Sequence, residues 1–231
     1  MISKRRHPYL WGLVFLLLVV CSSCSSLPQR VAVSDPQDQK AAWDLVNHFI
    51  HSRPSISQRT DAILFTISGR AMSFLGYSRI DRRRETFSAA GITPLGIKIF
   101  EFSGDAQAVD IIHMQKEFSR MGNAGEAIAA DIRRIYFDSY PGKDARIERY
   151  PGFFVFTDSR SGHFMEYTFS AADGMLIRKR RLENGREIWS LSFTAYYQDG
   201  GRFFPQHILL EHGKNRYRLE IVLKKLHADL P

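Results

Sequence analysis

The chain has 231 residues, a formal net charge of +8 at neutral pH and an aromatic content of 13%. This length is sufficient for one domain with a substantial core. It contains only two cysteines, Cys21 and Cys24, and both lie near the N-terminus. A disulfide framework is therefore excluded for the rest of the chain, which must be stabilised by its core.

The N-terminal segment has the pattern of a bacterial lipoprotein signal. The basic residues 4–6 precede an apolar run over 10–20, which is about half of the roughly 20 residues that a membrane-spanning helix needs. Two serines come directly before Cys24. We therefore expect residues 1–23 to be a signal peptide and Cys24 to be lipidated, which would anchor the chain by its acyl chains. The alternative is an ordinary secreted protein with a cysteine near its cleavage site.

The residue after Cys24 bears on where the lipoprotein is sorted. Ser25 stands where an aspartate would retain a Gram-negative lipoprotein at the inner membrane, so we expect outer-membrane sorting with the domain on the periplasmic face. An exported lipoprotein rarely meets nucleic acid. The moderate basic charge is better explained by a solvated surface or by anionic lipid headgroups.

A single domain is predicted over 36–231, joined to the anchor by a polar tether over 24–35. Ser34 and Asp35 are candidate N-cap residues, and Pro36 suits the first position of a helix. Apolar residues then recur at helical spacing, and this helix should end before Pro54.

The rest of the chain predicts strands, apart from one helical stretch over 115–140 that is broken near Gly122. Strands are expected from about Asp61, and residues 172–174, 183–185, 199–201 and 212–213 are predicted turns. Asn184-Gly185 is a strong hairpin signal. Within the strand over 187–197, alternation predicts that Trp189, Leu191, Phe193, Ala195 and Tyr197 share one face.

These elements predict an α+β fold. About 10 or 11 antiparallel strands in meander order should form a strongly curled, incomplete barrel, with an N-terminal helix and a helical insertion. A curled sheet has a concave face that something must fill. Either an apolar cavity lies there or the helices plug it, and the pattern alone leaves both open.

The segment over 83–111 resembles the outer-membrane lipoprotein receptor family LolB. Thr93-Pro94-Leu95-Gly96 and its flanks match the turn and the two strands that characterise this family. Other parts agree in order: a helix containing a tryptophan, a strand containing Ser68-Gly69-Arg70, two helical pieces, and Phe204–Ile208 before a last strand. The wider superfamily includes the soluble carrier LolA and uncharacterised paralogous families.

The resemblance implies a non-enzymatic carrier without cofactor or metal, acting as a monomer. It would bind lipid or lipoprotein acyl chains in an apolar cavity, receive them from a periplasmic LolA-like carrier and deliver them to the inner leaflet of the outer membrane. The family's protruding turn leucine, needed for insertion, corresponds to Leu95; the alternative is a buried turn leucine. Candidate cavity-lining residues are Phe65, Ile67, Phe87, Ile99, Phe102, Trp189, Leu191 and Phe193.

The chain departs from the family pattern in three places. Thr93 replaces an asparagine, the 82–84 arginine triplet is denser, and residues 142–160 are longer and more aromatic. These departures leave the substrate open. The triplet could bind lipid headgroups or phosphate, or be a row of solvated strand residues. A competing hypothesis is an accessory lipoprotein that binds an envelope protein while its cavity is plugged.

Other chemistry has little support in the sequence. His48 and His51 lie three residues apart on the predicted first helix, but a metal site needs further ligands. No serine-elbow, zinc-protease or phosphate-loop motif is present. We therefore expect no catalytic activity.

Overall fold

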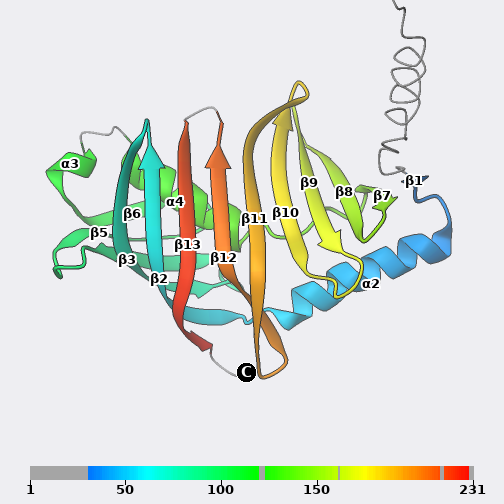
Figure 1. The fold of residues 1–231 in the computed structure, drawn as a ribbon, viewed down its shortest axis with the longest axis horizontal. Helices are drawn as coiled ribbons and strands as arrows, with labels where there is room; N and C mark the ends of the chain where they lie inside the picture. The colour runs from blue at the N-terminus through cyan, green and yellow to red at the C-terminus, as the bar shows by residue number, and fades with distance from the viewer. Residues whose placement is uncertain (1–30, 120–122, 161, 214–215, 229–231) are drawn as a thin grey trace, which may run out of the picture. The chain divides into compact units, whose positions relative to one another are not determined.

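One antiparallel sheet of 13 strands dominates the computed structural model, which describes residues 31–228 except 120–122, 161 and 214–215. The strand order is β1-β7-β8-β9-β10-β11-β12-β13-β2-β3-β4-β5-β6, and the sheet does not close. The predicted signal peptide over 1–23 and the predicted lipidation site Cys24 lie outside the described residues. In Figure 1 the strands curve around helix α4, while α2 crosses the sheet near β8–β10.

The strands of the first half are β1 (Val31–Ala32), β2 (Ile56–Ile67), β3 (Arg70–Asp81), β4 (Thr86–Ile92), β5 (Lys98–Gly104) and β6 (Val109–Met114). Those of the second half are β7 (Arg146–Tyr150), β8 (Phe153–Arg160), β9 (His163–Ser170), β10 (Leu176–Glu183), β11 (Arg186–Asp199), β12 (Arg202–His212) and β13 (Tyr217–Ala228). The pairing of β13 with β2 places the last strand of the chain beside a strand of its first third, in the middle of the sheet, whereas β1 lies at one edge.

Helix α2 (Pro36–Ser52) begins as predicted. The side chain of Asp35 accepts a hydrogen bond of 2.8 Å from the backbone N–H of Gln37, and Pro36 follows directly after this N-cap. The helix packs its apolar stripe on the sheet, where Trp43 contacts Phe156 of β8 edge to face at a centroid distance of 5.1 Å. The predicted start, end and inner face of this helix are therefore confirmed.

The helical insertion is shorter than predicted. It consists of α3 (Lys116–Ser119) and α4 (Ala124–Tyr136), so α4 ends four residues before Tyr140. The expected break falls on residues 120–122, outside the described part of the chain. Helix α4 turns its apolar side toward the sheet, with Ile132 and Ile135 buried. None of the helices in the described ranges combines the length and apolar character needed to cross a membrane.

The prediction of about ten strands was too low, for identifiable reasons. Strand β3 was not expected, and Ser68-Gly69 forms the turn between β2 and β3 rather than part of a strand; both residues have positive φ. Strand β7 was also missed. Finally, β1 lies in the segment predicted as tether: Val31 pairs with Arg149, so the folded part extends five residues before Pro36.

The inner face of the sheet is continuous from β9 to β3. Side chains on this face alternate with outward ones and pair across neighbouring strands, in the row Tyr167, Lys179, Leu191, Leu210, Leu219, Phe65 and Met72. Both α2 and α4 pack on this face. The core therefore lies between one curved sheet and two helices.

Candidate functional site: a pocket under helix α4

A pocket of about 320 Å³ lies between α4 and the half of the sheet made by β13 and β2–β5. Its walls are largely apolar, and their residues include Ile63, Phe65 and Ile67 of β2, Phe74 of β3, Phe100 of β5, Phe118 of α3, Ile128 and Ile132 of α4, and Leu219 and Ile221 of β13. We call this space the α4 pocket.

The sequence of α4 explains why this helix leaves a pocket. Residues 124, 127, 128, 131, 132 and 135 all line it, which is the spacing of one helix face. Two of these are alanines, Ala124 and Ala127, so the N-terminal part of the helix fills little of the space beneath it. The isoleucines at 132 and 135 are buried farther along the helix.

Two glycines lie in the strands opposite α4. Gly76 of β3 pairs with Gly91 of β4, and a β-carbon on either would clash: at Gly76 it would lie 2.4 Å from Cδ1 of Ile63, and at Gly91 2.5 Å from the Phe100 ring. Neighbouring apolar side chains therefore fold over both glycines. The side chains of Ile63 and Phe100 therefore form part of the pocket wall.

The two carboxylates that line the pocket, Asp61 and Asp131, are both paired. The hydroxyl of Tyr217 lies 2.7 and 2.8 Å from the two carboxylate oxygens of Asp131, and the guanidinium of Arg134 donates to the same carboxylate at 2.5 Å. Burial raises the pKa of Asp131, while the nearby charge of Arg134 opposes this shift. At one end, Asp61 is paired with the buried Arg59.

The structure separates the predicted cavity residues into two groups. Phe65 and Ile67 line the α4 pocket. Phe87 of β4 and Ile99 and Phe102 of β5 are buried nearby, and the rings of Phe87 and Phe102 are 6.1 Å apart. None of these three is on the pocket wall.

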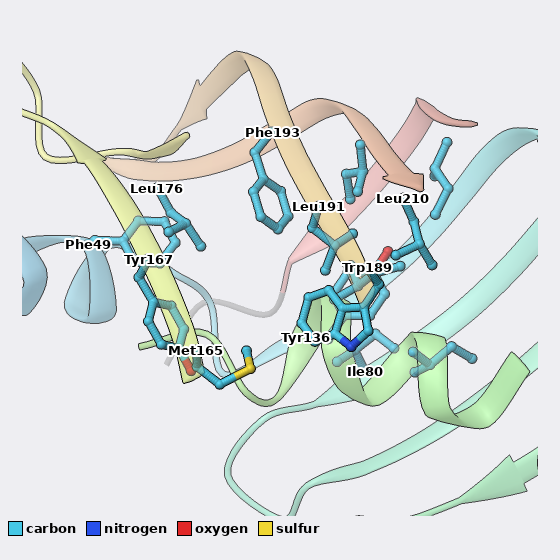
Figure 2. Close-up of a cluster of buried hydrophobic side chains, with 14 of the residues drawn as sticks. Phe49, Ile80, Tyr136, Met165, Tyr167, Leu176, Trp189, Leu191, Phe193 and Leu210 are labelled. Atoms are coloured by element: carbon cyan, nitrogen blue, oxygen red, sulfur yellow. The ribbon is translucent and has the colours of Figure 1, made fainter. Parts of the chain in front are cut away.

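The remaining three predicted residues lie in the other half of the sheet. Figure 2 shows Trp189, Leu191 and Phe193 on β11, with Tyr136 of α4 near Trp189. All three side chains are buried in the core. Phe193 also lines a small cavity of about 30 Å³ at the end of α2, whereas the larger α4 pocket lies over the other half of the sheet.

Several pocket residues were not among the candidates, although the sequence carries a signal for them. Ile63 alternates with Phe65 and Ile67, and Leu219 and Ile221 alternate with polar residues in the last strand. The inward face of β13 could therefore be predicted from its period of two. The position of β13 beside β2 could not be predicted, because residues 150 or more apart in the chain form that contact.

The predicted insertion turn joins β4 to β5. The backbone N–H of Gly96 donates to the carbonyl oxygen of Thr93 at 2.9 Å, with Pro94 in the second position of the turn. The hydroxyl of Thr93 accepts from the N–H of Ile97 at 3.1 Å. Threonine therefore supplies a side-chain hydrogen bond that closes the turn. The Leu95 side chain is 88% exposed and Ile97 is 53% exposed, so the turn carries an apolar tip.

No cluster that could hold a metal is found among the residues described here. Within the described part of the chain, no three histidine, cysteine or acidic side chains come together in a way that could hold a metal ion. His51 contacts the backbone oxygen of Asn47 at 2.6 Å, and the His48 ring packs near Phe203.

No protein-family model matches the sequence, and no curated protein matches it in sequence. Solved structures do match it in fold. A LolA superfamily protein from Nitrosomonas europaea superimposes with a TM-score of 0.53 at 12% identity, covering 82% of this chain and 94% of that one. The chain has the fold of the LolA superfamily.

A second solved structure agrees in fold. A domain assigned to outer membrane lipoprotein sorting, from Vibrio parahaemolyticus, superimposes with a TM-score of 0.52 at 12% identity and covers 82% of this chain and 91% of that one. The expected open, curled antiparallel sheet with helices on its inner face is thus confirmed as LolA-like. At this level of identity the likeness concerns the fold.

Proposed function

We propose that this chain is a non-enzymatic lipoprotein, anchored in the outer membrane, that binds acyl chains of lipids or lipoproteins and helps to deliver them to that membrane. The observation that carries the proposal is the α4 pocket, whose walls are largely apolar and whose charged groups are already paired. Such a lining favours a hydrocarbon ligand over a polar one.

The pocket's size and its position in the fold support the same ligand class. A volume of about 320 Å³ is at the lower end of the range for small-molecule sites, roughly 300–1,000 Å³. Each methylene transferred from water contributes about 0.8 kcal/mol. Part of one acyl chain would therefore suffice for transient binding, which suits a protein that must release its cargo.

The exposed turn at Leu95 supports a delivery role. An apolar tip in water can enter the acyl region of a bilayer at little cost to the folded domain. With Cys24 lipidated, the anchor would hold the pocket and this tip beside the receiving leaflet. A periplasmic LolA-like carrier would be the donor, and the chain would act as a monomer.

The test is to purify the chain from bacterial envelopes, extract it with organic solvent and identify bound lipid by mass spectrometry. Ile128→Glu places a carboxylate at the half-buried pocket face of α4 and should abolish the bound lipid. Ile177→Glu makes the same change at an exposed site on β10 and should retain it. An empty wild-type pocket, or equal lipid in both variants, would contradict the proposal.

An accessory role through a protein partner is the second candidate. It is favoured by β6, which is the last strand of the sheet and exposes Ile111 and Ile112. An edge strand of this kind can pair with a strand of another protein. Stable co-purification of one envelope protein with lipid-free chain, lost on Ile112→Lys, would support this role over the first.

A further inference from the structure

A second cavity, much smaller than the α4 pocket, lies at the C-terminal end of α2. Its volume is about 30 Å³, and its lining includes three arginines: Arg53, which follows α2, Arg59 of β2 and Arg82, which follows β3. We call it the arginine cavity. Its lining residues include no aspartate or glutamate.

One of the three arginines is neutralised. Arg59 donates to both carboxylate oxygens of Asp61, at 3.2 and 3.0 Å, and both side chains are buried. This pair leaves the charges of the other two arginines without compensation.

Arg53 is the least satisfied cation in the cavity. Its Nη2 donates to the backbone oxygen of Tyr136 at 3.2 Å, but its Nη1 is enclosed and has no hydrogen-bond partner. The residue as a whole is partly exposed, so the enclosure concerns the end of the guanidinium that faces inward. A buried donor without a partner is costly, and more so when it is charged.

Arg82 adds a second positive charge. Its Nη1 has only a long contact, 3.5 Å, to the backbone oxygen of Pro54. Within the described ranges, no carboxylate lies at ion-pair distance from Arg53 or Arg82. Burial, together with repulsion from Arg82, lowers the pKa of Arg53 to about 9. Both groups are still charged at neutral pH.

We propose that the arginine cavity binds a phosphate-type oxyanion between Arg53 and Arg82. Guanidinium groups present paired donors that match phosphate oxygens, and an anion here would give the enclosed Nη1 of Arg53 its missing partner. The space is about twice what one water molecule needs, which suits a small oxyanion and excludes a whole lipid.

The oxyanion has two chemical sources: inorganic phosphate, or the phosphate of a lipid headgroup. Ile135 and Tyr136 line both the arginine cavity and the α4 pocket, so the two spaces are neighbours. A lipid with its acyl chain under α4 could therefore reach the arginines with its phosphate. Inorganic phosphate tests the anion site without any lipid. The proposal of an anion site therefore does not depend on whether the α4 pocket binds acyl chains.

The 82–84 arginine triplet provides a matched control. Arg82 lines the cavity, whereas Arg83 and Arg84 are exposed. Replacing Arg84 by glutamine removes the same charge from the same segment without touching the cavity. Arg53→Gln is a second variant at the cavity itself.

The experiment follows thermal unfolding of the full chain in a non-ionic detergent, with sodium phosphate replacing sodium chloride at constant ionic strength. Wild type and Arg84→Gln should show a saturable rise in Tm with phosphate. Arg82→Gln and Arg53→Gln should bind phosphate at least about tenfold more weakly, as expected for the loss of a charged hydrogen-bonding group. A parallel series uses short-chain phosphatidic acid, with the matching diacylglycerol as the phosphate-free control.

A saturable response to inorganic phosphate supports an oxyanion site open to free phosphate. A response to phosphatidic acid alone, lost in Arg82→Gln and absent with diacylglycerol, supports a headgroup site. No saturable response to either ligand would overturn the proposal. So would equal responses in Arg82→Gln and Arg84→Gln, because the effect would then be general screening.

Discussion

The ammonium group of Lys179 on β10 donates a hydrogen bond of 2.7 Å to the backbone oxygen of Arg134 near the end of α4. The same group contacts the backbone oxygen of Asp138 and lies 3.3 Å from its carboxylate. Lys179 is fully buried, against the rings of Tyr167 and Trp189. A cation thus satisfies carbonyl groups that the end of the helix leaves free, and ties α4 to the sheet.

This burial predicts a specific pH dependence of stability. Burial lowers the pKa of Lys179 from 10.5 to about 8, although Asp138 opposes the shift. Between these values the unfolded chain binds a proton that the folded chain lacks, so the free energy of unfolding should rise with pH, by roughly 3 kcal/mol in all. Urea unfolding from pH 7 to 11 should show this rise in wild type relative to Lys179→Met. Parallel curves for the two proteins would contradict it.

The buried pair of Arg59 and Asp61 should behave as a unit. Asp61→Leu leaves a buried guanidinium without its carboxylate and should lower the free energy of unfolding by about 3–5 kcal/mol, and Arg59→Met should have a similar effect. The free energy of unfolding of the double variant should be much closer to that of wild type, because neither buried charge is then left without its partner. Urea denaturation of all four proteins gives the coupling. If the losses of the two single variants simply add in the double variant, Arg59 and Asp61 are not energetically coupled.

Local signals in the sequence predicted much of the fold. The Asp35-Pro36 start of α2 and the Asn184-Gly185 hairpin depend on residues adjacent in the chain, and each lies where expected. The Thr93–Gly96 turn lies where the family resemblance placed it. Strand β3 was missed because Ser68-Gly69-Arg70 was assigned to a strand, whereas Ser68 and Gly69 form the tight turn that precedes β3. Strand β7 was missed because it is short.

The candidate site was less accessible to sequence reasoning. Alternation identified inward residues such as Phe65 and Trp189 equally well, but only the first lies at the α4 pocket. The difference depends on which helix covers which half of the sheet, and that is a long-range property. The arginine cavity depends on the same kind of contact, since Arg53 and Arg82 are 29 positions apart.

The backbone of Ala195, with a φ of 52°, interrupts the predicted alternation of β11, and it predicts a stabilising substitution. Thr194 pairs with His207 and Tyr196 with Pro205, and Ala195 between them adopts a left-handed backbone conformation that a residue with a β-carbon rarely takes. Ala195 and Tyr197 are therefore exposed rather than on the inner face with Phe193 as predicted. Glycine adopts this φ without strain, so Ala195→Gly should raise the free energy of unfolding by up to about 1 kcal/mol.

Thermal or urea unfolding measures this change. Ala90→Gly, at a regular paired position on β4, is the matched control and should instead lower stability, because glycine in a regular strand loses more conformational entropy. If both substitutions destabilise the chain by the same amount, the strain assigned to Ala195 does not exist.

The turn at Leu95 allows delivery to be separated from folding. Because this side chain is 88% exposed, Leu95→Glu should change the free energy of unfolding by less than about 0.5 kcal/mol. The charged tip should nevertheless enter a bilayer poorly, so transfer of a labelled lipoprotein from a LolA-like carrier to outer-membrane vesicles should fall severalfold. Ile112→Glu, at another exposed isoleucine on β6, should leave transfer unchanged. Normal transfer by Leu95→Glu, or an equal loss in both variants, would remove the turn from the delivery mechanism.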